Sequence, residues 1–204
     1  IEYKHVPRFD SGSDESIDHL ESEGYVIIKN ALTANEATKT LDLLWDYLEN
    51  LGTGIDRTNP MTWSDDKWPT CAHGGIIPSY GIGHSEAQWF VRGVPNVKKA
   101  FAKVWGTNDL LTSFDGVSLW RPWNIDPSWK TQSGQAWFHI DQHPISKPGK
   151  QCIQGLINLL PTSKEIGGNV VIPKSHNFFK DIPEQYKERV ERLPLDIDHF
   201  RFPH

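Results

Sequence analysis

The chain has 204 residues, of which 37% are apolar and 11% aromatic, including nine tryptophans. This length and composition predict one folded domain with a sizeable core rather than a disordered chain. The formal net charge is −5, and the chain contains neither a run of lysine or arginine nor an apolar run long enough to cross a bilayer, which argues against a nucleic-acid partner and a membrane span.

The chain contains two cysteines, Cys71 and Cys152, which lie far apart and form no Cys-x-x-Cys motif. This pattern argues against a thiolate zinc site. We expect two reduced thiols in a cytoplasmic protein, and a single disulfide is the alternative.

Helical patterns dominate the first half of the chain. The clearest covers residues 33–50, where Thr33 and Glu36 have the spacing of a capping box. Residues 52–83 are rich in glycine, proline and tryptophan and have no periodicity, and a loop of this length is usually functional. Further helices are predicted at residues 13–23, 85–90 and 95–105, and a short strand at residues 24–28.

Strand patterns dominate the second half. They are predicted at residues 111–120, 136–142, 152–160, 169–172 and 200–202, with a helix at residues 178–193. Helices followed by antiparallel strands predict a mainly β fold with N-terminal helices, a double-sheet jelly roll. We expect a single domain over residues 1–204. Its helical support should cover about residues 13–106 and its jelly-roll strands about residues 111–204.

The most informative motif is His139-Ile140-Asp141, within the predicted strand at 136–142. Residues two apart on a strand point to the same face, so the imidazole and the carboxylate should project side by side. One histidine and one carboxylate are two of the three protein ligands of the facial triad that binds Fe(II) in oxygenases. The motif alone is short enough to arise by chance, so its neighbours matter.

The segments after this motif make a chance match less probable. A strand, Ile153 to Leu159, is succeeded by a glycine-glycine turn and the segment Asn169-Val170-Val171-Ile172-Pro173-Lys174-Ser175-His176. This order resembles the phytanoyl-CoA dioxygenase family of Fe(II)/2-oxoglutarate oxygenases, over roughly residues 20–204. The resemblance implies a double-stranded β-helix, the cupin-like jelly roll. It also implies Fe(II) bound by His139 and Asp141, 2-oxoglutarate as cosubstrate with O₂, and hydroxylation of a small-molecule substrate.

The sequence does not identify the third metal ligand that a facial triad requires. In the family a distal histidine lies on a later strand and is followed by an arginine that pairs with the far carboxylate of 2-oxoglutarate. No such arrangement is evident before the chain ends, and His199 and His204 are the candidates that remain. We therefore expect this sequence to lack the C-terminal part of the family's domain.

Four further residues are candidates for binding 2-oxoglutarate or substrate. Trp137 shares a strand face with His139, Gln154 and Asn158 share a face of the next strand, and Asp115 precedes the cavity-lining strand. Each of the four could instead have only a structural role: packing for the tryptophan, a hydrogen bond at the end of a sheet for the two amides, and a turn or surface position for the aspartate. His143 lies about 13 Å along the strand from His139, too far to share an ion, and is expected at the cavity rim or surface.

Two other functions remain open on the sequence. The chain could be an inactive or truncated jelly-roll domain kept for binding or assembly, although a dead site has no need for the His-x-Asp pair. It could also be a cupin-like metal enzyme that uses no 2-oxoglutarate. The expected partner is a small molecule, with no nucleic acid and no membrane, and the sequence leaves the oligomeric state open.

Overall fold

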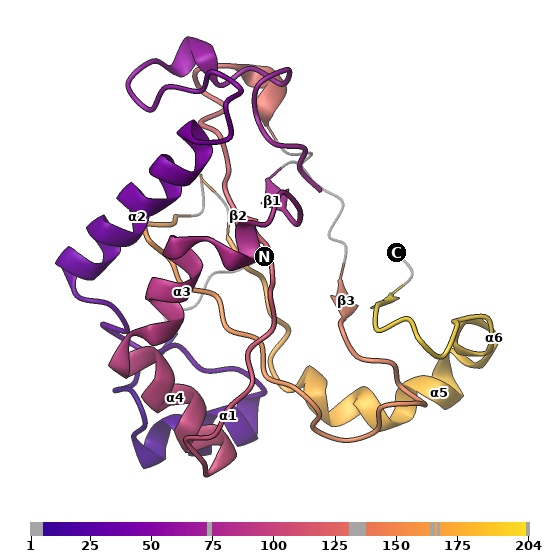
Figure 1. Cartoon of the computed structure of the whole chain (residues 1–204). Coiled ribbons are helices and arrows are strands. Elements are labelled where there is room, and N and C mark those ends of the chain that lie inside the picture. Colours follow the sequence, from indigo (N-terminus) through magenta and orange to yellow (C-terminus); the bar gives the residue numbers. More distant parts are fainter. Residues whose placement is uncertain (1–5, 73–74, 131–137, 164–165, 167, 203–204) are drawn as a thin grey trace.

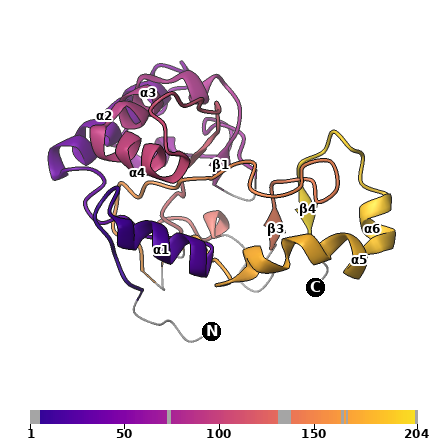
Figure 2. The same ribbon diagram turned by 90° about the horizontal axis from the view of Figure 1, so that it is seen from below.

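The structure is a computed structural model that describes residues 6–72, 75–130, 138–163, 166 and 168–202. Four helices lie together on one side of the molecule (Figures 1 and 2). They are α1 (Asp14–Glu23), α2 (Ala34–Glu49), α3 (Glu86–Gly93) and α4 (Pro95–Trp105). The predicted N-terminal helices are therefore confirmed, with ends that differ by up to three residues.

The capping box begins α2 as predicted. The Thr33 backbone N–H donates to Glu36 Oε2 at 2.7 Å, and the Glu36 N–H donates to Thr33 Oγ1 at 3.2 Å. These bonds satisfy N–H groups that the helix cannot pair internally. The apolar stripe of α2 then places Leu44 and Leu48 in the interior, beside α3.

The long segment after α2 is a folded part of the core. Its buried side chains form a cluster with the end of α2, made of Leu48, Ile55, Trp68, Ile77 and Ile82. Within it, β1 (Ile76–Ile77) pairs antiparallel with β2 (Val117–Ser118), the register placing Ile77 opposite Val117. Short 3-10 helices, η1 (Pro60–Thr62), η2 (Ile82–His84) and η3 (Pro127–Trp129), complete this half. The absence of periodicity thus reflects tight turns around a tryptophan-rich core.

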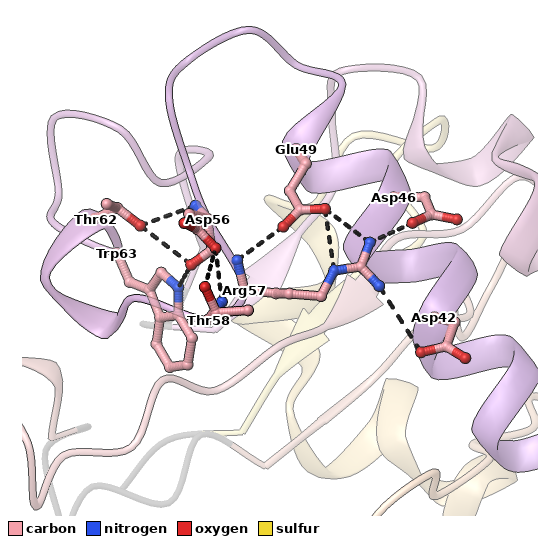
Figure 3. A network of polar contacts seen from close by, with 8 residues as sticks. All are labelled: Asp42, Asp46, Glu49, Asp56, Arg57, Thr58, Thr62 and Trp63. Carbon is pink, nitrogen blue, oxygen red and sulfur yellow. Dashed lines mark hydrogen bonds and ion pairs between the residues drawn. The ribbon is translucent and has the colours of Figure 1, made fainter.

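A network centred on Arg57 ties the segment after α2 back to that helix (Figure 3). The Arg57 guanidinium donates to Glu49 Oε2 from Nε at 3.0 Å and from Nη2 at 2.7 Å, and it also contacts Asp46. Next to it, Asp56 accepts bonds from the Thr58 side chain and backbone. These contacts fix the direction in which the chain leaves α2.

The C-terminal part forms a second, smaller cluster on the other side of the molecule (Figure 2). The strands β3 (His139–Ile140) and β4 (Phe200–Arg201) pair antiparallel. Between them along the chain lie η4 (Ser175–Asp181), α5 (Ile182–Gln185) and α6 (Lys187–Glu191). The buried residues of this cluster are Ile182, Val190 and Phe200.

The prediction of a mainly β fold is wrong for the described residues, in which helices outnumber strands. The four strands have two residues each and form two separate two-stranded sheets. Residues 151–158 and 169–172 carry no regular secondary structure, although their sequence pattern predicts strands. A strand is stabilised by its ladder partner, and no described strand forms a ladder with these segments. Several of their apolar side chains are exposed, among them Leu156 at 57% and Val170 at 53%.

The other expected elements are shorter or broken. The predicted helix at residues 178–193 divides into η4, α5 and α6, because Tyr186 has a non-helical backbone between the last two. The short strand at residues 24–28 is reduced to one bridge between Phe9 and Ile28. Both cysteines are free thiols. Among the helices of the described residues, none has the length and apolar character needed to cross a membrane.

Replacing Arg57 by alanine should lower the free energy of unfolding by about 1 kcal/mol, because a partly buried guanidinium loses its carboxylate partners. Urea denaturation measures this change. Arg192→Ala is the matched control: its side chain is 82% exposed and lies 3.9 Å from Glu188. It should cost less than about 0.5 kcal/mol. Equal losses in the two variants would contradict a structural role for the network.

The effect of Arg57→Ala should also depend on pH. Hydrogen bonds from Arg57 lower the pKa of Glu49 below its ordinary value of 4.5. The contribution of this carboxylate is therefore present above pH 4.5 and is lost as the pH falls through the lower folded-state pKa. The stability difference between the two proteins should shrink when denaturation is repeated at about pH 3.

Candidate metal centre

The site is built by the pairing of β3 with β4. The register places His139 opposite Arg201 and Ile140 opposite Phe200, and the Phe202 N–H donates to the Phe138 carbonyl at 3.0 Å. Directly opposite residues of an antiparallel pair share a face, and successive residues alternate between faces. One face of this ribbon therefore carries apolar side chains into the second core. The other face carries the polar ones.

The polar face brings together two histidines and one carboxylate. His139 Nε2 lies 3.5 Å from Asp141 Oδ2, and His199 Nδ1 lies 3.0 Å from Asp141 Oδ1. The two imidazole rings are 4.6 Å apart between centroids. One ligand atom from each of the three side chains falls within 4.8 Å of the others. The antiparallel register explains why these side chains lie close together. Extended by one residue beyond Ile140 and Phe200, it places His199 opposite Asp141.

The Asp141 carboxylate is held in its ionised form. Burial raises its pKa, but hydrogen bonds from Gln154 and His199 and the nearby imidazoles outweigh burial and lower the pKa below its ordinary value of 3.8. A metal ion binds the deprotonated carboxylate. The surroundings of Asp141 thus favour the charge state that ligation needs.

Gln154 supports this carboxylate from the neighbouring segment. Its Nε2 donates to Asp141 Oδ2 at 2.9 Å, so Oδ2 is shared between the amide and His139 while Oδ1 faces His199. Such a bond fixes the orientation of a carboxylate ligand. The sequence pattern suggests a role for Gln154 in binding cosubstrate or substrate, whereas the structure shows it bonded to Asp141.

The other sequence candidates do not join the group of three. Asn158 is exposed further along the segment of Gln154. Asp115 is also exposed and outside the group, and its carboxylate accepts a bond from Ser113 Oγ. Trp137 and His204 lie outside the described residues. The predicted pair is therefore joined by one of its two candidate partners, His199.

The expectation that His143 lies at a rim or surface is wrong. Its side chain is fully buried, and its Nδ1 accepts bonds from the backbone N–H groups of Ile145 and Ser146 at 3.1 and 3.0 Å. The chain turns at Pro144 and folds back over the ring. His143 therefore stabilises the turn that ends the segment carrying the His-x-Asp motif.

Sequence reasoning missed Arg201. A signal was available, because His199-Phe200-Arg201 repeats the polar-apolar-polar period of His139-Ile140-Asp141 and overlaps the strand predicted at residues 200–202. That period does not identify the partner strand or the register. Paired with β3, Arg201 shares the face of the two histidines and Asp141.

Two imidazoles and a carboxylate are a donor set for a divalent transition metal such as Fe(II), and in a facial arrangement they leave further coordination positions open. The side chains are accessible, with His139 26%, Asp141 37% and His199 46% exposed. The donor set therefore fits a metal centre.

Comparison with known proteins identifies two relatives. The chain is 31% identical over 185 residues to "Ava biosynthesis cluster protein O" of Aspergillus versicolor, covering 91% of this chain and 58% of that protein. It is 26% identical over 198 residues to "Putative phytanoyl-CoA dioxygenase" of Dictyostelium discoideum, covering 79% of this chain and 55% of that protein. The predicted resemblance to the phytanoyl-CoA dioxygenase family is confirmed by this homology.

The chain spans little more than half the length of these two curated relatives. No family model matches the chain, and no solved structure matches it.

Titration with Mn(II) or Co(II) should reveal one binding site that depends on all three side chains. Replacing either histidine by alanine should weaken binding by roughly 100-fold or more, because losing a direct ligand costs more than the 10- to 100-fold seen for residues that only support one. Isothermal titration calorimetry measures this effect.

The matched control is His84→Ala, which removes an exposed histidine stacked on Phe114 in the other half of the molecule. It should leave the affinity unchanged. Unaltered binding in His139→Ala would refute the site, and unaltered binding in His199→Ala alone would remove His199 from the ligand set.

Proposed function

We propose that this member of the phytanoyl-CoA dioxygenase family is an Fe(II)- and 2-oxoglutarate-dependent oxygenase that hydroxylates a small molecule. The observation that carries the proposal is the convergence of His139, Asp141 and His199 on one face of the β3–β4 ribbon. The homology supplies the reaction class, and the donor set is the one that this class uses.

The three side chains would hold Fe(II). When bound, the metal would supply the redox chemistry that couples conversion of 2-oxoglutarate and O₂ to succinate and CO₂ with hydroxylation of the substrate. The protein's part is to hold its ligands in place. Asp141 carries the negative charge, Gln154 orients it, and the buried Phe200, with Ile140 packed against its cluster, anchors both strands behind the site.

Arg201 is proposed to bind the far carboxylate of 2-oxoglutarate. It lies opposite His139 in the register, on the face of the proposed ligands. A guanidinium has a planar arrangement of donors that binds a carboxylate bidentately. The same ribbon would then provide both the metal ligands and the cosubstrate anchor.

The double-stranded β-helix of the family is also proposed for the complete fold. Its support is the family homology and the exposed apolar side chains of two segments with strand-like sequence, Leu156 in the first and Val170, Val171 and Ile172 in the second. Apolar side chains gathered on a surface favour a covering partner, which additional strands would provide.

A small-molecule substrate is proposed from two observations. One relative is named for a biosynthesis cluster, which points to the oxidation of a metabolite. The candidate centre is also accessible from solvent, as its exposed His199 shows. Neither observation requires an acyl-CoA substrate.

The proposal is tested by incubating the chain with Fe(II), 2-oxoglutarate and O₂ and measuring succinate. Slow succinate formation is expected even without substrate, because the cosubstrate can turn over uncoupled. His139→Ala should abolish it and His84→Ala should retain it. If the chain binds metal and forms no succinate, the oxygenase proposal fails, and a metal enzyme that uses no 2-oxoglutarate takes its place.

The role of Arg201 has its own test. Arg201→Ala should raise the Kd for 2-oxoglutarate by about tenfold or more, because a charged hydrogen bond contributes about 1.5–3 kcal/mol. Arg201→Lys should recover part of the affinity, and Arg192→Ala, at the end of α6, is the matched control. Metal affinity should stay the same in all three. An unchanged Kd for 2-oxoglutarate in Arg201→Ala would rule out this anchor.

A further inference from the structure

A cavity that is open to solvent lies against α4, separate from the candidate metal centre, which is formed between β3 and β4 (Figure 1). Its volume is about 470 Å³, within the range of pockets that bind small molecules. Three lysines of α4 line it, namely Lys98, Lys99 and Lys103. Gly12, Pro95 and Ala102 also belong to the lining.

The lysines share one side of α4 because of their spacing. Lys99 and Lys103 follow Pro95 at intervals of four residues, and Lys98 follows it at three, which places them on one side of a helix. Val97, by contrast, is buried in the interior. The helix thus presents a cationic face to solvent between Lys98 and Lys103.

The N-terminal arm runs along this face and forms the other wall. Ser11 Oγ donates to the Asn96 carbonyl at 2.5 Å, at the start of α4. At the next residue of the arm, Gly12 has φ +70°, and a Cβ there would lie 3.0 Å from the Lys99 side chain. A glycine is therefore favoured where the lysine stem lies against the arm. The arm is fixed to the helix rather than loosely placed beside it.

The cavity has an excess of positive charge. Lys103 has a carboxylate partner, Asp14 at 2.5 Å. Within the part of the chain that the structure describes, neither Lys98 nor Lys99 has a carboxylate at ion-pair distance, and the cavity lining contains no acidic residue. Three ammonium groups and one carboxylate give this cavity a local charge of about +2. The chain as a whole has a net charge of −5, so the cavity is positive on a negatively charged protein.

We propose that this cavity binds a phosphorylated small molecule. Two ammonium groups without a carboxylate partner among the described residues match an anion of charge −2 or more. Lysine binds phosphate as a point charge, whereas a planar carboxylate favours the fork of an arginine. Pro95, Ala102 and the lysine stems provide apolar surface for the rest of the ligand.

The test uses pyrophosphate as the probe, titrated into the chain by calorimetry at low ionic strength. Binding is expected, and the double variant K98A/K99A should weaken it by about tenfold, since each exposed ion pair contributes up to about 1 kcal/mol. Alanine favours helix, so α4 should remain folded, which circular dichroism checks.

The matched control is K180A/K187A, which removes two exposed lysines from η4 and α6 and changes the net charge equally. It should bind pyrophosphate like the unmodified chain, and His139→Ala should do the same because the metal centre is separate. No binding, or an equal loss in the two lysine variants, would overturn the proposal. Citrate binding as tightly as pyrophosphate would overturn the assignment to phosphate.

Discussion

The antiparallel pairing of β3 with β4 is the contact on which the rest of the site depends. Its register places Ile140 and Phe200 together in the second core and turns His139, Asp141, His199 and Arg201 to the opposite face. A slip of one residue would exchange the two faces of a strand, burying charged groups and exposing aromatic ones. Packing of Phe200, which is 1% exposed, therefore selects the register that assembles the polar face.

The position of Asp141 joins three segments that are distant in the sequence. It receives a hydrogen bond from Gln154 and lies beside His199, while its strand neighbour His139 occupies the same face. These contacts lower the pKa of the carboxylate despite the cost of partial burial. Because the Asp141 carboxylate is already ionised, it can bind a cation without first losing a proton. The cationic cavity at α4 is built on the other half of the molecule, so the two sites can be altered independently.

Local signals in the sequence predicted the helices and the first two residues of the candidate metal centre, and tertiary pairing decided the rest. The capping box of Thr33 and Glu36 and the first-turn position of Pro95 mark helix starts that the structure confirms. Alternation was enough to place His139 and Asp141 on one side of a strand. His199 and Arg201 required the register of a strand about sixty residues away along the chain, about which a single sequence carries no direct information. The segments at 152–160 and 169–172 form no described strand, because strand propensity does not provide a partner.

We propose that the β3–β4 ribbon supplies two imidazoles, those of His139 and His199, to one metal ion. The most direct measurement is the X-ray absorption spectrum of the metal-loaded chain, in which multiple scattering from imidazole rings reports how many histidines are bound. We predict two imidazoles in the unmodified chain and one in both His139→Ala and His199→Ala. A spectrum with a single imidazole in the unmodified chain, or one that His199→Ala leaves unchanged, would contradict this claim.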